Sequence, residues 1–317
     1  MLPELRTLEG LEALREAGYG FSAFDLPRQF KMQAEIVASA VKVIQNLTDE
    51  PKIVYDTAYL ILDSLLAAPN GLQFFSRFPK EEIAQFGYLA VASRLNHQPV
   101  PVVCPVCPDY RGHYQIGDGI SRTAEAVMVK IPTIKEFFEK RGLSVFIAIQ
   151  LADVEAYDQF ILEASGETEA GFLGKTRTSI EKIQTRIDEL GLAGIVQAES
   201  MSEALGRSGI DYFYLKEVKA EQISKSENRK VRRAIEALVT ERQKLGDFET
   251  ISKPDRRSMV VRELADYSVY GDYVGGRAVI LSADALSAVP AYNFLRGKEK
   301  AISPTVYLKD VKIAYDR

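Results

Sequence analysis

In the first hundred residues, apolar side chains recur every three or four positions, as on one face of a helix. This spacing predicts helices around 36–47, 53–66 and 81–95, with a turn at Pro69-Asn70-Gly71 after the second. The residues that carry the first pattern are Ile36, Val37, Ala40, Val41, Ile44 and Leu47. We therefore expect a helical N-terminal region over residues 1–98.

The pattern changes at Pro99. Residues 101–106 form a short apolar run rich in valine, and residues 144–151 are apolar almost throughout, as expected of strands covered on both faces. A helical pattern over 122–141 separates them and ends at Gly142. Strand, helix and strand in this order predict a right-handed parallel unit.

The remaining chain continues this alternation. Strands are predicted at 194–198, 277–282 and 304–308, and helices at 173–190, 211–246 and 257–270. A further helix is predicted to begin at Ser200, with Glu203 as its capping-box partner. We expect an α/β fold over residues 99–317: a Rossmann-like parallel sheet flanked by helices, preceded by the helical N-terminal extension.

Composition limits the classes of function. The chain has 317 residues and a net charge of -4, which argues against a general nucleic-acid coat but not against a local basic patch. The first twenty residues lack the apolar core of a signal peptide, and no apolar run is long enough to span a bilayer. These observations predict a cytoplasmic protein without membrane contact.

Cysteine usage predicts reduced thiols. Cys104 and Cys107 stand in a Cys-Pro-Val-Cys run, and His97 and His113 are the only histidines. A disulfide framework requires more cysteines, and the histidines lack zinc-finger spacing. Zinc therefore remains an alternative to the favoured interpretation, a pair of thiols at a strand end with no metal.

Polar side chains follow the two strongest predicted strands. Asp109 and Tyr110 come after the first strand, and Asp153, Glu155 and Asp158 come after the second. Ligands bind beyond the carboxyl ends of strands in open parallel sheets, and clustered carboxylates favour contact with water, a cation or a cationic substrate. These five residues are candidate substrate ligands. The alternative is a solvated loop in which Asp153 caps the next helix.

The glycines after the first strand predict a turn. Gly117-Asp118-Gly119 lacks the glycine spacing of a dinucleotide site, and the chain has no P-loop motif. We therefore predict no cofactor.

The helix predicted over 257–270 carries a second group of candidates. Glu263, Tyr267 and Tyr270 fall on one helical face. A carboxylate with a phenol can transfer protons when buried, so Glu263 and Tyr267 are candidate catalytic residues. Tyr270 on the same face is a further candidate substrate ligand. Packing of an amphipathic helix through its tyrosines is the alternative.

Basic residues gather between 225 and 244, and four of them are candidates for binding RNA phosphates. On a helix such residues also occur as an ordinary solvated face. The four candidates are Arg229, Lys230, Arg232 and Arg233.

Two stretches resemble the tRNA-dependent cyclodipeptide synthases. Asp158-Gln-Phe-Ile-Leu-Glu-Ala-Ser-Gly-Glu-Thr-Glu-Ala170 is similar to a family segment in which an Asp shortly after a strand leads into an Ala-x-Gly-x-Ser segment and a long helix. Val196-Gln-Ala-Glu-Ser-Met-Ser202 resembles the next family strand and the start of its helix. The likeness covers about residues 100–310 in outline and is close over 158–205.

The resemblance implies a Rossmann-like enzyme that takes aminoacyl-tRNA and an amino-acid-derived substrate, forms an aminoacyl-enzyme on a serine, and releases a diketopiperazine. The family's basic tRNA-facing helix corresponds to the one that carries Lys175, Arg177, Lys182 and Arg186. In place of the family's Gly-x-Ser, this chain has Pro-Val-Cys-Pro, so Cys107 becomes the candidate nucleophile. The family's Tyr-x-x-x-Glu pair is not reproduced, because Tyr267 follows Glu263 by four residues.

Two alternatives stay open. Pro105-Val-Cys-Pro108 looks like a segment of the isonitrile synthases, which implies action on a free amino acid and a sugar phosphate, although the lysine that should follow is missing. The other alternative is a non-catalytic binding protein on the same fold.

Overall fold

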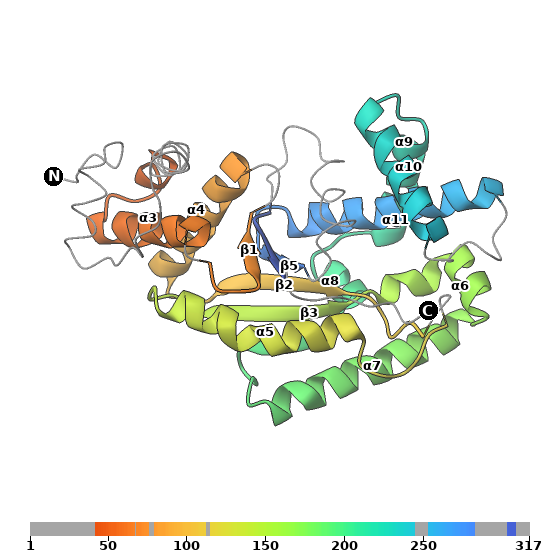
Figure 1. Cartoon of the computed structure of the whole chain (residues 1–317), viewed down its shortest axis with the longest axis horizontal. Coiled ribbons are helices and arrows are strands. Elements are labelled where there is room, and N and C mark those ends of the chain that lie inside the picture. Colours follow the sequence, from red (N-terminus) through yellow and green to blue (C-terminus); the bar gives the residue numbers. More distant parts are fainter. Residues whose placement is uncertain are drawn as a thin grey trace.

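The computed structural model describes residues 42–66, 68–75, 79–111, 115–244, 253–282 and 303–308 (Figure 1). Residues 36–41 of the helix predicted over 36–47, and the candidate zinc ligand His113, lie outside these residues. Within them, the chain is an α/β protein with a mostly parallel, six-stranded sheet flanked by helices, which confirms the predicted fold class.

The elements alternate along the chain as the hydrophobic pattern predicts. The strands are β1 (Leu72–Phe74), β2 (Val100–Val106), β3 (Val145–Leu151), β4 (Val196–Ser200), β5 (Val279–Ser282) and β6 (Thr305–Leu308). The helices are α3 (Pro51–Leu66), α4 (Pro79–Asn96), α5 (Arg122–Glu139), the 3-10 helix η1 (Asp153–Tyr157), α6 (Gln159–Ser165), α7 (Glu169–Glu189), α8 (Met201–Arg207), α9 (Tyr212–Ser224), α10 (Arg229–Lys244) and α11 (Lys253–Val274).

The strands are arranged in the order β1-β6-β5-β2-β3-β4. From β2 the chain moves outward through β3 to β4, then returns to β5 on the other side of β2. All pairs are parallel except β1 with β6, which is antiparallel. The direction in which strands are added to the sheet reverses between the paired strands β2 and β5. This is the topological switch point, and open parallel sheets bind ligands at the carboxyl ends of the strands there.

Two helix boundaries follow the local signals in the sequence. Gly142 adopts a φ of 67° directly after α5, a conformation that favours glycine. Ser200 caps α8 by accepting a hydrogen bond from the Glu203 amide at 3.1 Å, as predicted. The segment 211–246, predicted to be largely helical, consists of two helices, since α9 ends at Ser224 and α10 runs from Arg229 to Lys244.

Central strand β2 contains Pro101 and Pro105, although proline lacks the amide that a strand ladder uses. Val100 donates to Ser144 and Val106 accepts from Ala152, so the even-numbered residues of β2 bond toward β3. The odd-numbered positions, which include both prolines, face β5 instead. Because β5 pairs with β2 only at positions 102 and 103, both prolines lie beyond that ladder and cost no hydrogen bond.

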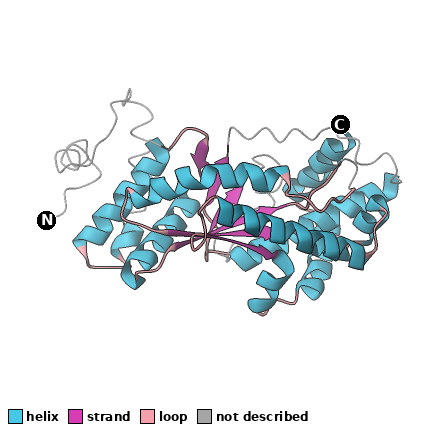
Figure 2. Ribbon diagram, turned by 90° about the horizontal axis from the view of Figure 1, so that it is seen from below, coloured by secondary structure: helices cyan, strands magenta, loops and turns pink. Residues whose placement is uncertain are grey.

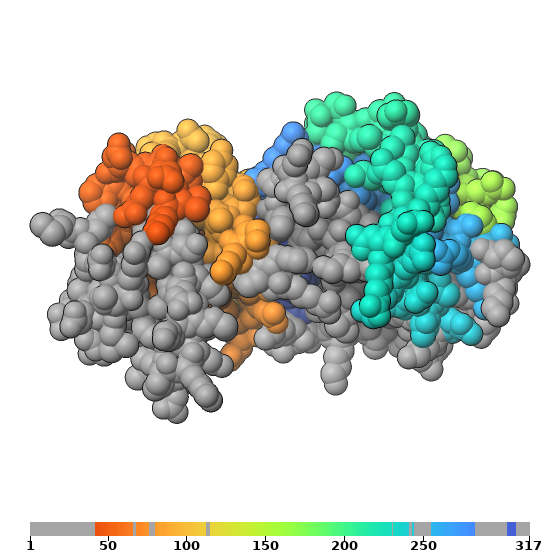
Figure 3. Space-filling view, turned by 90° about the horizontal axis from the view of Figure 1, so that it is seen from above, coloured from red at the N-terminus to blue at the C-terminus, as the bar shows by residue number. Residues whose placement is uncertain are grey.

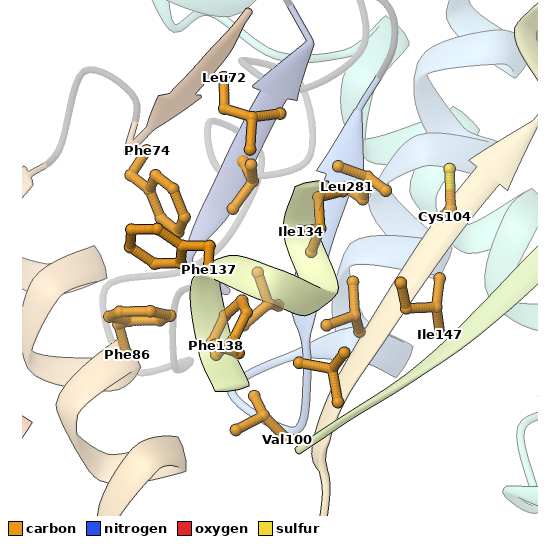
Figure 4. Packing of buried hydrophobic residues seen from close by; sticks show 14 of the residues in the cluster. Leu72, Phe74, Phe86, Val100, Cys104, Ile134, Phe137, Phe138, Ile147 and Leu281 are labelled. Carbon is orange, nitrogen blue, oxygen red and sulfur yellow. The ribbon is translucent and has the colours of Figure 1, made fainter. Parts of the chain in front are cut away.

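The two faces of the sheet are covered by different helices (Figure 2). On one face, Val102, Cys104, Ile147 and Leu281 pack against α5 and α7 in a core of aliphatic and aromatic side chains (Figure 4). The opposite face carries Val103, Ala148, Ile280 and Tyr307, which pack against α8, α9 and α11. Alternate residues of each strand face opposite sides, so one strand contributes to both cores.

The N-terminal segments belong to the same core as the sheet. Ile61 of α3 and Phe86 of α4 lie in the cluster that contains β2, and Asp63 forms a buried ion pair with Arg141 after α5. The short strand β1 interrupts the region predicted to be helical and pairs with β6. The boundary at residue 98 stays a prediction.

Among the described residues, no helix combines the length and the apolar character needed to cross a membrane.

Candidate functional site

The candidate site lies at the carboxyl ends of β2, β3 and β4. These strands end level with one another, since Val106 pairs with Leu151 and Leu151 pairs with Ser200. The loops that leave them therefore begin side by side, next to α9 and α11. This arrangement brings together several of the predicted site residues and some that the sequence did not indicate.

Asp109 organises the loop after β2. Its carboxylate accepts a hydrogen bond from the Gly119 amide at 3.0 Å and forms an ion pair with Arg111 at 3.2 Å. A Cβ at Gly117 or Gly119 would lie 2.3 or 2.6 Å from this carboxylate, so a side chain at either position would displace Asp109 from the loop. The Gly-Asp-Gly segment thus allows the loop to close around Asp109, in agreement with its interpretation as a turn. The role of Asp109 in substrate binding stays a prediction.

A hydrogen bond joins the loop after β2 to the loop after β3. The Tyr110 hydroxyl donates to a carboxylate oxygen of Glu155 in η1. Both residues were predicted from their positions after strands, and the structure places them in contact. The two loops therefore form one unit at the end of the sheet.

Asp153 is buried and bonds to the start of α8. Its carboxylate accepts from the Ser202 amide at 2.9 Å and from the Ser202 hydroxyl. The alternative in which Asp153 caps the next helix is wrong, because α8 is a later helix that follows β4. Burial raises the pKa of Asp153, and the bonds from Ser202 oppose this effect.

Asp158 belongs to a buried ionic cluster. Lys216 of α9 lies 3.2 Å from Asp158 and 2.8 Å from Asp266 of α11. Arg262 of α11 lies 3.1 Å from Asp158, and Tyr212 of α9 donates to Asp266. We call these five residues the ionic cluster. Since they come from the segment after β3 and from α9 and α11, the cluster fixes the three segments together.

The electrostatics of the ionic cluster follow from burial and pairing. Burial raises the pKa of Asp266, and the neighbouring Lys216 only partly opposes this. Burial also disfavours the charged form of Lys216, but Asp266 and Asp158 outweigh it and raise the Lys216 pKa. Asp158 additionally caps α6 by accepting from the Phe160 amide at 3.0 Å. Its side chain is 5% exposed and serves these internal contacts, while its predicted role as a substrate ligand stays a prediction.

Sequence reasoning singled out Asp158 but missed its partners. Lys216 lies between Tyr212 and Ala220 on the buried face of α9. A charged side chain at a position whose neighbours one turn away are buried signals an internal ion pair. That signal was present in the sequence, but the identity of the partners was not.

The predicted pair on α11 is formed. The Tyr267 hydroxyl donates to Glu263 at 2.9 Å, and both side chains are partly exposed. Arg262 and Asp266 of the ionic cluster are sequence neighbours of this pair, so contacts from the loop after β3 position the same part of α11. The catalytic roles of Glu263 and Tyr267 stay predictions.

Tyr270, the third predicted residue of α11, points to the sheet. It is 1% exposed and donates to the Gln150 side chain at 2.5 Å. The Gln150 amide in turn donates to Glu199 of β4 at 2.7 Å, and Arg207 forms an ion pair with Glu199. We call these four residues the glutamine network. Sequence analysis missed Gln150 and Glu199 because they occupy strands that were assigned only to the core.

The two cysteines lie in different environments. Cys104 is buried within β2, where burial raises its pKa strongly, and Cys107 is exposed directly after the strand. Both are thiols, and no group of three metal-ligating side chains occurs in the part of the chain that is described. Of the two cysteines, Cys107 is the one accessible to a substrate, and its role as a nucleophile stays a prediction.

The predicted tRNA-binding residues form two separate groups. α7 packs on the aliphatic face of the sheet, whereas α10 packs on α11 beyond the opposite face (Figure 1). On α7, Lys175 pairs with Glu167, Lys182 with Asp118 and Arg186 with Glu189, while Arg177 is exposed. On α10, Arg229, Arg232 and Arg233 are exposed. The side chain of Lys230 is not among those that the structure describes.

The chain matches no known family model, and no curated protein is significantly similar to it. The likeness to the cyclodipeptide synthases therefore depends on the quoted motifs and on the order of the elements. It stays a prediction from the sequence.

Proposed function

We propose that this protein is an aminoacyl-transferring enzyme of the cyclodipeptide synthase type, in which Cys107 replaces the family's serine. The observation that carries the proposal is the connection between the loop of Cys107 and helix α11. Tyr110, three residues after Cys107, bonds to Glu155, and Asp158 bonds to Arg262, the neighbour of Glu263. Through these two contacts, the loop that follows the candidate nucleophile is linked to the helix that carries the candidate proton-transfer pair. Both lie at the carboxyl end of a parallel sheet, where such folds bind ligands.

The first step forms a thioester. The Cys107 sulfur attacks the ester carbonyl of an aminoacyl-tRNA, the bond to the ribose oxygen breaks, and the thiol proton passes to that oxygen. A cysteine suits this step because a thiolate is a strong nucleophile and a thioester is readily attacked by an amine.

The second step transfers the acyl group to an amine. The amino group of a second aminoacyl-tRNA attacks the thioester, forming an amide and releasing the Cys107 thiolate. Glu263 accepts the proton that the amine loses, and its hydrogen bond from Tyr267 orients the carboxylate. The amine of the first residue then attacks the remaining ester, and its proton passes to the ribose oxygen as the diketopiperazine and the second tRNA leave. Glu263 returns its proton to the Cys107 thiolate, which restores the enzyme.

The proposal is tested by incubating the protein with a mixture of charged tRNAs and analysing the products by mass spectrometry. We expect a diketopiperazine from the wild type and a loss of at least a hundredfold in Cys107→Ala. Cys104→Ala is the matched control, because it removes the other thiol of the same motif from a buried position. Glu263→Gln should slow turnover and leave acyl-enzyme on Cys107, visible as an added mass that hydroxylamine removes.

Three outcomes would contradict the proposal. Undiminished product from Cys107→Ala would exclude the thiol as nucleophile. Absence of both product and acyl-enzyme with every charged tRNA would exclude the activity. Conversion of a free amino acid without tRNA would instead support the isonitrile synthase alternative.

A further inference from the structure

Exposed aromatic rings lie together at the start of α9. Phe213 and Tyr214 are 53% and 66% exposed, and they are the only large apolar residues adjacent in sequence that are this exposed in the described chain. Tyr157 of η1 meets Phe213 edge to face, with ring centroids 4.8 Å apart and an interplanar angle of 87°. We call Tyr157, Phe213 and Tyr214 the aromatic ledge. Single exposed apolar residues are common on protein surfaces, whereas contiguous exposed groups mark binding surfaces.

The aromatic ledge adjoins the candidate site. Tyr157 lies in the helix that directly follows β3, and the residue before Phe213 is Tyr212 of the ionic cluster. The rings of Tyr212 and Phe213 are 5.4 Å apart. Helices α9 and α10 form the molecular surface at the end opposite α3 and α4 (Figure 3). A ligand on the ledge would therefore lie beside the loops that carry the predicted substrate ligands.

The charges around the ledge are negative. Burial raises the pKa of Tyr157, and the negative charges of Asp153 and Glu169 add to this effect. Asp211, the exposed N-cap of α9, lies two residues before Phe213. The cations of the ionic cluster, Lys216 and Arg262, are bound to carboxylates. The ledge therefore opposes phosphate binding and favours a cation.

We propose that the aromatic ledge binds the cationic end of an amino-acid side chain, a guanidinium or an ammonium group. Aromatic faces attract such cations through the ring quadrupole, and a planar guanidinium also stacks on them. Asp211, whose carboxylate accepts a hydrogen bond from the Tyr214 amide at 3.1 Å, supplies the countercharge at the edge of the ledge. The assignment of this amino acid as a substrate rests on the proposed function, whereas the binding itself does not.

The test compares two probes of equal shape and different charge. N-acetyl-L-arginine amide carries the guanidinium as its only charge, and N-acetyl-L-citrulline amide replaces it with a neutral urea. Binding is followed by NMR shifts of the protein's aromatic rings. We expect the arginine derivative to bind at least fivefold more tightly, and Phe213→Leu and Asp211→Asn each to weaken it about three- to fivefold. Asparagine at position 211 can still cap α9, so this variant removes the charge alone.

Tyr88→Leu is the matched control, because Tyr88 is an exposed aromatic residue on α4, distant in sequence from the ledge. It should leave binding unchanged, and circular dichroism should show that all the variants fold. Equal binding of the two probes, or unchanged binding in Phe213→Leu, would overturn the proposal. Since the assay needs neither tRNA nor turnover, binding without diketopiperazine formation would refute the proposed function alone.

Discussion

The two faces of the sheet share the same strands but differ in the side chains that connect them to the helices. Along β3, Ile147 and Ile149 face α5 and α7 and lie in a cluster of aliphatic and aromatic side chains. Ala148 and Gln150 face the other side, where Gln150 is hydrogen-bonded to groups of α11 and β4. The comparison shows that the first face stabilises the fold by hydrophobic packing, which has no preferred direction. The hydrogen bonds and ion pairs of the second face are directional and therefore fix the positions of its helices.

The largest effect should come from breaking the ionic cluster on the polar side. Lys216→Met leaves Asp158 and Asp266 buried without their shared cation, which should cost about 3–5 kcal/mol of unfolding free energy. The loss should be smaller at pH 4 than at pH 7, because protonation removes the uncompensated charges. Urea denaturation at both pH values measures it.

The double variant Lys216→Met/Asp266→Asn is the control for charge. It should regain part of the lost stability because one buried carboxylate has been neutralised. A loss below about 1 kcal/mol in the single variant would show that the cluster is solvated and does not hold the helices.

On the aliphatic face, Ile147→Ala should cost about 2–5 kcal/mol, because Ile147 is fully buried and its removal leaves a cavity. The loss should be nearly independent of pH, in contrast to that of Lys216→Met. Val129→Ala on the outer side of α5, where the side chain is 72% exposed, should change stability by less than about 0.5 kcal/mol. Similar losses at both positions would contradict the described core.

The glutamine network should be more sensitive to lost partners than to lost volume. Gln150→Leu keeps the size but leaves Tyr270 and Glu199 without this partner, which should cost about 1–3 kcal/mol. Tyr270→Phe should cost about 0.5–1.5 kcal/mol. In a double-variant cycle the two losses should not add, since they remove the same bond. Full additivity would mean that the bond contributes nothing.

The smallest effect concerns Asp153. Because burial raises its pKa above the ordinary 3.8, its contribution to stability is complete below that value and is lost as the pH rises through the folded-state pKa. Asp153→Asn cannot ionise, so its stability relative to the wild type should increase from pH 3.8 upward. Denaturation curves between pH 3.5 and 7 measure this difference. A relative stability that decreases with pH would contradict the burial of Asp153.

Much of the fold was predictable because its signals are local. The apolar runs of β2 and β3, the glycine after α5 and the Ser200 cap lie within a few residues of the structure they specify. The pairing of Tyr267 with Glu263 was predictable for the same reason, since four residues span one turn of a helix. Strand β1 was missed because three residues are too few to show a period.

The sequence by itself determined the alternation of strands and helices, the thiols at the end of β2 and the polar residues that follow the strands. Only the tertiary structure decided which of these polar residues meet. Asp158 and Lys216 are 58 positions apart and Gln150 and Tyr270 are 120 apart, so no local pattern relates them. Their contacts arise because a parallel sheet brings the ends of successive strands to one edge, and because α9 and α11 pack across that edge with charged and hydrogen-bonding groups that must find partners once buried.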